Sequence, residues 1–518
     1  MDVWAWICEL PMSDEWSEEH SFTLELAREH SCSITLKADR TQGSNSEALV
    51  TFSIYLSGFD TINSQKSIWV SDGCPLTEKQ GQFLPLVLQL LLETVSRSPG
   101  GQGNTLCPRS NLQKLKPDPI IWLMDSHSPE SFSTFFNLIF ITRLFWLCVS
   151  DSPVDVGSLY FYKILSPNIE LVSSFHQAPV LKKFLISVGV DVELCFMRTL
   201  GYILAKWLIL KEVNGLVKSP NLSGFSYATE SHGFWTLKGY APIGSMRLTS
   251  SSDLKAKSLV HSFDPTEAAL RYALAHQHLE AVIQLEYSVT FLDNFIQVNA
   301  RVDNIRIHMT KLGFNKYDND SEFSQERHFP SRIRVWVGPE VGASYVAGLS
   351  LSKSTENAVT ETECRKTLKG SFGSTKVVPT VKSTSRTSAR TKTKAWRWDQ
   401  EAEGNAAVFD AVLCDPATGL DVASGGGGGG MGLRKRYSGA SRAFSKTGGL
   451  VLAGDEYGDG VVWRVGKEME GSVLTWRIGG EILVSYCASE VKSGYWECRC
   501  VEWCDEVDLP LISTKTVV

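Results

Sequence analysis

Residues 295–309 read FIQVNARVDNIRIHM, and this stretch decides the fold class of the second half of the chain. Apolar residues occupy the even positions from 296 to 302 and then, after a change of parity at 303–304, the odd positions from 305 to 309. Alternation with a period of two is typical of a strand with one buried face, and a change of parity indicates a β-bulge or a bend. Similar runs separated by glycine turns fill residues 225–512, which predicts an antiparallel β sandwich or open barrel. Among them, 234–240 and 246–250 are expected to form a hairpin, 473–478 and 482–487 are expected as separate strands, and one helix is expected over 266–278. The block from Trp463 through Trp476 to Trp503 is expected to supply an aromatic core.

Toward the N-terminus the pattern changes to helical spacing. Residues 75–218 read as a helical block, in which Ser128-Pro129-Glu130 has the serine cap and first-turn proline that are typical of a helix start. A second helix is expected over 178–213, with a break near Gly189. Residues 1–74 form a small β unit, with strand-like runs at 21–36, 48–56 and 67–70. The predicted fold class is therefore α+β: a small N-terminal β unit and a helical layer, followed by the larger β block.

The two most apolar helical runs are expected to be core helices. The first, 135–149, contains Arg143, and the second contains Glu193, Arg198 and Lys206. A membrane span needs about 20 mostly apolar residues, and a central arginine costs about 2.5–3.5 kcal/mol on insertion scales. No transmembrane span is predicted.

The composition favours an intracellular globular protein. The chain has 518 residues, 43% of them hydrophobic, and a net charge of −6, which gives no general attraction to nucleic acid. Residues 1–9 lack the basic and apolar regions of a secretory signal, so the 12 cysteines are expected to be reduced thiols. We expect a cytoplasmic location, with a nuclear or peripheral membrane location as alternatives.

Two stretches of the β block are predicted to be mobile loops, at 352–394 and 421–446. The first contains nine lysines and arginines and no acid over 365–394, and the second contains six consecutive glycines at 425–430. Basic residues of the first loop are candidates for binding phosphate or an anionic membrane surface. The candidates are Lys382, Arg386, Arg390, Lys392 and Lys394.

Two groups of residues have types that could ligate a metal ion. They are Cys498, Cys500 and Cys504 near the C-terminus, and Asp455, Glu456 and Asp459 in a glycine-flanked turn. The cysteines lack the paired C-x2-C knuckles that are typical of zinc sites. Calcium needs six to eight oxygen ligands, more than one short acidic turn supplies. We therefore predict structural cysteines and solvated acids, and no metal or other cofactor.

One histidine cluster suggests a general base. His276 and His278 lie near Glu280 and Glu286, and the two histidines share a face if this segment is a strand. No G-x-S-x-G, Walker A, H-E-x-x-H or kinase signature accompanies them. The cluster is therefore a weak catalytic candidate, and no catalytic residue is assigned.

Four stretches carry a family resemblance: 1–11 (MDVWAWICELP), 329–342 (FPSRIRVWVGPEVG), 403–409 (EGNAAVF) and 501–511 (VEWCDEVDLPL). They resemble a family of plant proteins of unknown function, and the likeness covers nearly the whole chain. The resemblance implies a plant, intracellular source and assigns no site. The glycine run departs from the loop that is usual in that family.

Three hypotheses of function remain open. The first is a non-enzymatic binding or adaptor protein with an unknown protein partner, because a β scaffold with long loops and no catalytic signature is typical of binding proteins. The second is a peripheral membrane or anionic-lipid-binding protein that acts through 365–394. The third is an enzyme whose site is assembled from residues dispersed along the chain.

Overall fold

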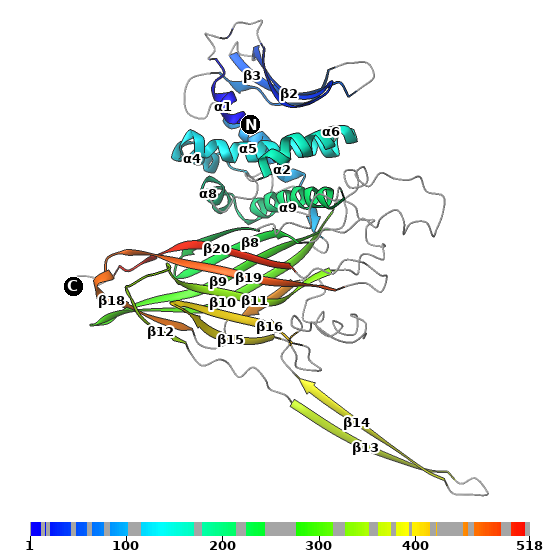
Figure 1. Ribbon diagram of the computed structural model, residues 1–518, viewed down its shortest axis with the longest axis vertical. Coiled ribbons are helices and arrows are strands. Elements are labelled where there is room, and N and C mark those ends of the chain that lie inside the picture. Colours follow the sequence, from blue (N-terminus) through cyan, green and yellow to red (C-terminus); the bar gives the residue numbers. More distant parts are fainter. Residues whose placement is uncertain are drawn as a thin grey trace. The chain divides into compact units, whose positions relative to one another are not determined.

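The computed structural model confirms the α+β class (Figure 1). It describes residues 2–11, 16, 21–42, 48–59, 65–76, 83–101, 115–169, 179–213, 224–243, 276–313, 327–351, 361–373, 380–392, 396–414, 421, 449–453, 460–487 and 499–512. The chain folds into two compact units. The first comprises Met1–Tyr227, Lys238–Glu280 and His308–Ser321, and the second comprises Ala228–Leu237, Ala281–Ile307 and Glu322–Val518.

The first unit begins with a short helix and an antiparallel sheet. The helix is α1 (Val3–Cys8), and the strands are β1 (Ser21–Glu29), β2 (Cys32–Gln42), β3 (Ala48–Ser57), β4 (Lys66–Val70) and β5 (Cys74–Pro75). The single strand expected over 21–36 is wrong, because the chain turns between β1 and β2. His30 forms this turn with a φ of 53°, a conformation that histidine tolerates better than β-branched residues do.

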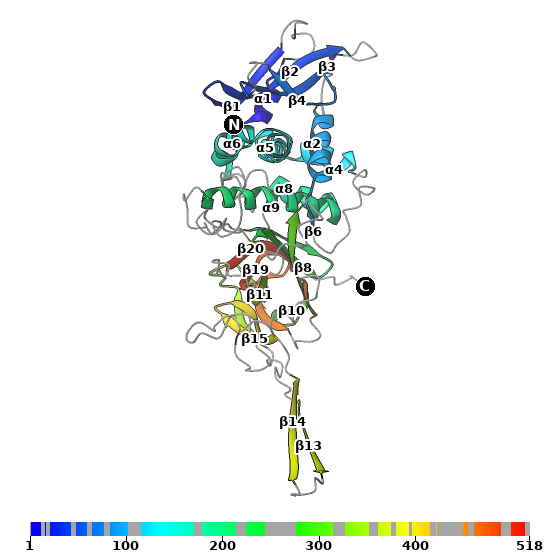
Figure 2. The same ribbon diagram turned by 90° about the vertical axis from the view of Figure 1, so that its right-hand side faces the viewer.

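Helices make up most of the remainder of the first unit. They are α2 (Leu84–Ser96), α4 (Pro117–Ser126), α5 (Pro129–Phe145), α6 (Val154–Leu159), α8 (Pro179–Ser187) and α9 (Val190–Val213). Two π-helical segments, η1 (Trp146–Ser150) and η2 (Tyr160–Leu165), extend α5 and α6. The β1–β4 sheet lies on one side of the layer that contains α2, α4, α5 and α6, and α8 and α9 lie on the other side (Figures 1 and 2).

The local signals for helix ends act as the sequence predicts. The Ser128 side chain accepts a hydrogen bond from the Ser131 backbone N–H at the start of α5. Gly189 separates α8 from α9 and has a φ of 86°. This left-handed conformation has little energetic cost for glycine, because glycine has no Cβ. Among the residues that the structure describes, one helix, Pro129–Ser150, is long and apolar enough to cross a membrane, and 89% of its most apolar 18-residue stretch is buried inside the protein.

Strands dominate the second half of the chain. An eight-stranded sheet has the order β12-β18-β10-β9-β8-β7, and β17 and β6 also pair with β10. Its strands are β6 (Gly100–Gly101), β7 (Phe225–Ser231), β8 (Phe234–Pro242), β9 (His276–Phe291), β10 (Phe295–Gly313), β12 (Val346–Leu351), β17 (Gly449–Ala453) and β18 (Val461–Gly466).

A five-stranded antiparallel sheet has the order β15-β16-β11-β19-β20. Its strands are β11 (Arg327–Pro339), β15 (Trp396–Glu403), β16 (Ala406–Leu413), β19 (Val473–Cys487) and β20 (Arg499–Pro510). The expected aromatic core forms in the second unit: Trp463, Trp476 and Trp503 are all buried, and the rings of Trp463 and Trp476 meet edge to face at 5.3 Å.

The change of parity at 303–304 is confirmed within β10. Ile296 to Val302 are buried at even positions, whereas Ile305 to Met309 are buried at odd positions. The two separate strands expected over 473–478 and 482–487 are instead the continuous strand β19. Gly479 and Gly480 lie inside it, because the Trp336 indole covers Gly479 and the Ile283 side chain contacts Gly480.

Four further expectations concern the second half of the chain. The helix predicted to end at His278 is wrong over 276–278, which begin β9, and residues 266–275 lie outside the described part. The predicted hairpin partner of β8, at 246–250, also lies outside it. The loop predicted at 352–394 is wrong over much of its length, because β13 (Glu361–Gly373) and β14 (Thr380–Lys392) form an antiparallel pair. Of the loop predicted at 421–446, only Asp421 is described, and it bridges to Cys414.

Candidate functional site

A buried carboxylate, Glu193, is the centre of a polar network in the first unit. It lies in the first turn of α9 and is 1% exposed. The hydroxyls of Tyr227 on β7 and Tyr240 on β8 both donate to its Oε1, the latter at 2.6 Å. The Lys238 ammonium donates to the other oxygen, Oε2, at 2.7 Å. Three partners from two strands thus hold one carboxylate of the helix.

The environment of Glu193 keeps both tyrosines protonated. Burial raises the pKa of Tyr227 and of Tyr240 far above the ordinary value, and the negative charge of Glu193 raises both further. Hydroxyls that keep their protons act as permanent donors to the carboxylate. The two tyrosine hydroxyls are therefore a fixed connection between the strands and α9.

A second ion pair lies on the same helix and involves the predicted histidine cluster. Arg198 of α9 forms two hydrogen bonds with Glu280 of β9, at 2.7 and 3.1 Å. His278 Nδ1 lies 3.4 Å from Glu280 Oε1. Burial alone would raise the pKa of Glu280, but the hydrogen bonds from His278 and Arg198 outweigh this effect and lower the pKa to about 2.

His278 is closed off from solvent. The side chain is 1% exposed, and its ring stacks on Tyr240 at a centroid distance of 6.1 Å. On the α9 side it fills the space next to Gly201, where an added Cβ would lie 2.5 Å from the ring carbon Cδ2. Tyr240 and Gly201 thus lie against two sides of the buried imidazole.

The other members of the histidine cluster are not part of this network. Glu286 pairs instead with Arg301, in the second unit. The side chain of His276 lies outside the described part of the chain. The structure thus brings together two of the four predicted residues, His278 and Glu280.

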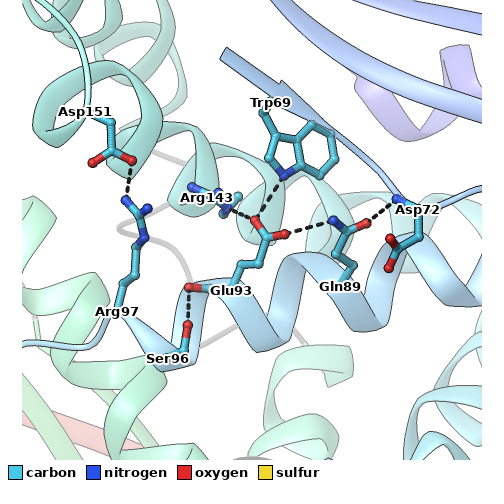
Figure 3. Close-up of polar contacts among 8 residues, drawn as sticks. All are labelled: Trp69, Asp72, Gln89, Glu93, Ser96, Arg97, Arg143 and Asp151. Carbon is cyan, nitrogen blue, oxygen red and sulfur yellow. Dashed lines mark hydrogen bonds and ion pairs between the residues drawn. The ribbon is translucent and has the colours of Figure 1, made fainter. Parts of the chain in front are cut away.

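Glu93 on α2 is the centre of another network in the first unit (Figure 3). Its Oε2 accepts hydrogen bonds from the Trp69 indole of β4, at 3.0 Å, and from Arg143 of α5. Its Oε1 accepts from Gln89 at 2.8 Å, and Gln89 in turn accepts from the Asp72 backbone N–H at 2.8 Å. One carboxylate therefore connects the N-terminal sheet to two helices.

Arg143 is the most deeply buried charge of the Glu93 network. Its side chain is 6% exposed, and burial lowers its pKa while the charge of Glu93 raises it in opposition. The Nη1 group has no hydrogen-bond partner among the described residues. The pair therefore depends on Glu93 for compensation of the arginine charge.

One surface of the helical layer exposes a large aromatic side chain. Trp122 of α4 is 50% exposed, and the Lys183 ammonium of α8 lies 5.3 Å from its ring centroid. Ile186 and Val190, at the end of α8 and the start of α9, are also exposed. We call Trp122 and Lys183, with Ile186 one turn further along α8, the Trp122 surface.

The cysteine candidates for a metal site lie apart from one another on β20. Cys500 and Cys504 are both exposed; Cys500 donates to Glu481 at 3.0 Å, and Arg477 donates to the Cys504 sulfur at 3.6 Å. Burial and then the hydrogen bond to Glu481 raise the pKa of Cys500 to about 12, which disfavours the thiolate that zinc requires.

The remaining metal candidates, Cys498, Asp455, Glu456 and Asp459, lie outside the described residues. Within the part of the chain that is described, no group of three or more histidine, cysteine or acidic residues is arranged to hold a metal ion. Seven of the described cysteines are free thiols, whereas Cys195 is disulfide-bonded, so the expected reduced state does not extend to it.

The basic candidates fall largely on one strand. Lys382, Arg386, Arg390 and Lys392 all occupy even-numbered positions of β14, which places all four on the same face of the strand. The structure describes the backbone of this strand, and Lys394 lies outside the described residues. The sequence places these residues close together, and the strand pairing adds their register.

The centres of both buried networks were not recognised as candidates from the sequence. A signal was present, because Arg143, Glu193 and Arg198 interrupt apolar helical runs. A charged residue in such a run needs a buried partner. The partners Glu93, Tyr227 and Tyr240 come from other segments and carry no local signal.

Comparison with known proteins gives no family. No protein-family model matches the chain, and no curated protein matches it. Among solved structures it is similar to the Clostridium perfringens NetB toxin in its membrane-inserted form, with 9% identity and a TM-score of 0.20 over 55% of this chain and 93% of that chain. It is also similar to Clostridium perfringens delta-toxin, with 8% identity and a TM-score of 0.21 over 55% of this chain and 96% of that chain. At these TM-scores the likenesses carry no inference about function.

Proposed function

We propose that this chain is a non-enzymatic binding protein whose helical layer engages a protein partner. The observation that carries the proposal is the Trp122 surface. A tryptophan that is 50% exposed is unusual, because this side chain gains much free energy from burial. Tryptophan is also enriched among the residues that dominate the affinity of protein interfaces.

The neighbours of Trp122 define the chemistry of the partner. Lys183 places a positive charge over the ring, and Ile186 adds apolar area that is 51% exposed. A matching partner presents an apolar anchor with carboxylates around it, because a buried apolar centre and a charged rim are typical of specific interfaces.

The buried networks support the non-enzymatic part of the proposal. Glu193, Glu280 and His278 have the residue types of acid–base catalysts, but each is occupied by structural partners inside the first unit. Perturbed pKa values also occur in structural ion-pair networks. Because α9 packs directly against His278, we interpret these residues as structural.

The test compares two variants of the full chain. Trp122→Ala removes the anchor, and Val341→Ala removes an apolar side chain that is 84% exposed in the second unit. Partners are cross-linked in cells of the source, identified by mass spectrometry and then measured with purified components. We expect one partner whose affinity falls at least about tenfold in Trp122→Ala and is unchanged in Val341→Ala. Equal affinity for both variants would contradict the proposal.

A further inference from the structure

The strands β13 and β14 form a two-stranded sheet of their own (Figure 1). Their register pairs Glu361 with Lys392 at one end and Gly373 with Thr380 at the other end, next to the connection between the strands. Residues directly opposite each other share a face of an antiparallel pair, and successive residues alternate between the faces. The register therefore sorts the sequence of both strands into two sets of positions.

The first set of positions carries most of the charge. It contains six basic residues, Arg365, Lys369, Lys382, Arg386, Arg390 and Lys392, and two acidic residues, Glu361 and Glu363. Both acids lie at the end far from the connection, where the register pairs Glu361 with Lys392 and Glu363 with Arg390. Charge is thus balanced at the far end, whereas the other four basic positions have no acidic position opposite them. Of these, Lys369 and Lys382 lie in the half next to the connection, Arg386 lies at the middle of the pair, and Arg365 lies just beyond the middle.

The second set of positions carries little charge. It contains one basic residue, Lys366, and no acid. Its large apolar residues lie in the half next to the connection, where Phe372 is opposite Val381, and Leu368 lies two positions further along the set, after Gly370. The same half of the pair thus combines an excess of positive charge on one face with apolar residues on the other face.

We propose that this half of β13–β14 docks on a membrane surface that contains anionic phospholipids. A membrane interface is attractive to both faces, because headgroup phosphates attract the lysines and arginines while the acyl boundary accepts apolar side chains. The phosphates of a nucleic acid would attract the basic residues but would gain nothing from the apolar positions. The apolar positions therefore favour a membrane over a nucleic acid.

The charge pattern supplies its own control. The double variant Lys382→Gln/Arg386→Gln removes two unopposed charges, and Arg390→Gln/Lys392→Gln removes two that are opposite acids. Both variants lower the net charge by two. Positions 382 and 390 are roughly 27 Å apart along a strand, which exceeds the screening length of about 8 Å in physiological salt.

Binding of the full chain is measured by co-sedimentation with phosphatidylcholine vesicles, with and without phosphatidylserine. We expect Lys382→Gln/Arg386→Gln to weaken binding to the anionic vesicles by roughly 30-fold, and Arg390→Gln/Lys392→Gln by less than roughly threefold. Equal losses in the two variants, or unchanged binding in both, would overturn the proposal.

A third variant separates a membrane from a nucleic acid. Leu368→Ser/Phe372→Ser keeps every charge, so docking on a membrane predicts weaker binding to anionic vesicles and unchanged binding to a random-sequence duplex DNA. Vesicle binding that does not depend on these two residues would contradict the membrane assignment. If this proposal fails, the proposed role of the Trp122 surface is not affected, because the two tests use different residues and different probes.

Discussion

The network around Glu193 allows a quantitative prediction. In the variant Glu193→Gln a neutral amide replaces a carboxylate that is 1% exposed and that accepts hydrogen bonds from two tyrosines and a lysine. Removing one partner of a buried charge pair costs about 3–5 kcal/mol. The Lys238 side chain is 23% exposed and can regain water, so we expect the lower end, about 3 kcal/mol of unfolding free energy.

A double-mutant cycle isolates the charged hydrogen bond. Tyr240→Phe should cost about 2 kcal/mol in the wild-type chain, because its hydroxyl donates to a charged acceptor. In the Glu193→Gln background the same change should cost about 1 kcal/mol, the value for a neutral pair. The matched control is Glu230→Gln, which removes an exposed carboxylate that accepts from Tyr287 at 2.8 Å and should cost less than about 1 kcal/mol.

The unfolding free energy is measured by urea titration, and hydrogen exchange of the α9 amides reports on the first unit separately. A cost below about 1 kcal/mol for Glu193→Gln, or strict additivity with Tyr240→Phe, would refute the interpretation of Glu193 as the charged centre of the network.

Three further predictions concern single contacts. Glu93→Gln should lower the unfolding free energy by about 3 kcal/mol or more, because it leaves the buried Arg143 charge without compensation, and Arg143→Met in the same chain should restore part of that loss in thermal unfolding. The lowered pKa of Glu280 contributes about 3 kcal/mol of stability, which is fully present above pH 4.5 and should disappear as the pH falls to about 2. The urea midpoint of Glu280→Gln should therefore depend less steeply on pH in this range than that of the wild-type chain. An unchanged slope would contradict the assignment. Gly479→Ala should destabilise the second unit by about 1–3 kcal/mol, because the new Cβ would lie 2.1 Å from the Trp336 indole, and Trp336→Leu should relieve the cost in calorimetry.

Local signals in the sequence were enough to predict most of the elements. The serine cap at Ser128, the break at Gly189 and the change of parity at 303–304 each depend on neighbouring residues, and each is confirmed. The predictions of secondary structure are wrong where contacts between residues far apart in the sequence determine the local structure. Gly479 reads as a turn residue, yet it lies inside a strand because Trp336 on the neighbouring strand occupies the space above it.

The polar networks were less accessible to prediction for the same reason. Sequence spacing brings His278 and Glu280 together, but Arg198 completes the group from 82 positions away. Spacing likewise cannot show that the helix at Gly201 closes over the imidazole. Whether a histidine is a catalyst or a structural group depends on such packing, which no local pattern contains.

The order of the five-stranded sheet has a consequence for synthesis of the chain. Its central strand, β11, pairs with β19, and Ser331 and Leu483, which are linked by a hydrogen bond, are 152 positions apart. A ribosome adds about 5–20 residues per second, so β11 emerges on the order of ten seconds before its partner exists. During that interval the apolar residues of β11 lack one neighbouring strand, so the unpaired edge of β11 is open to aggregation until β19 emerges.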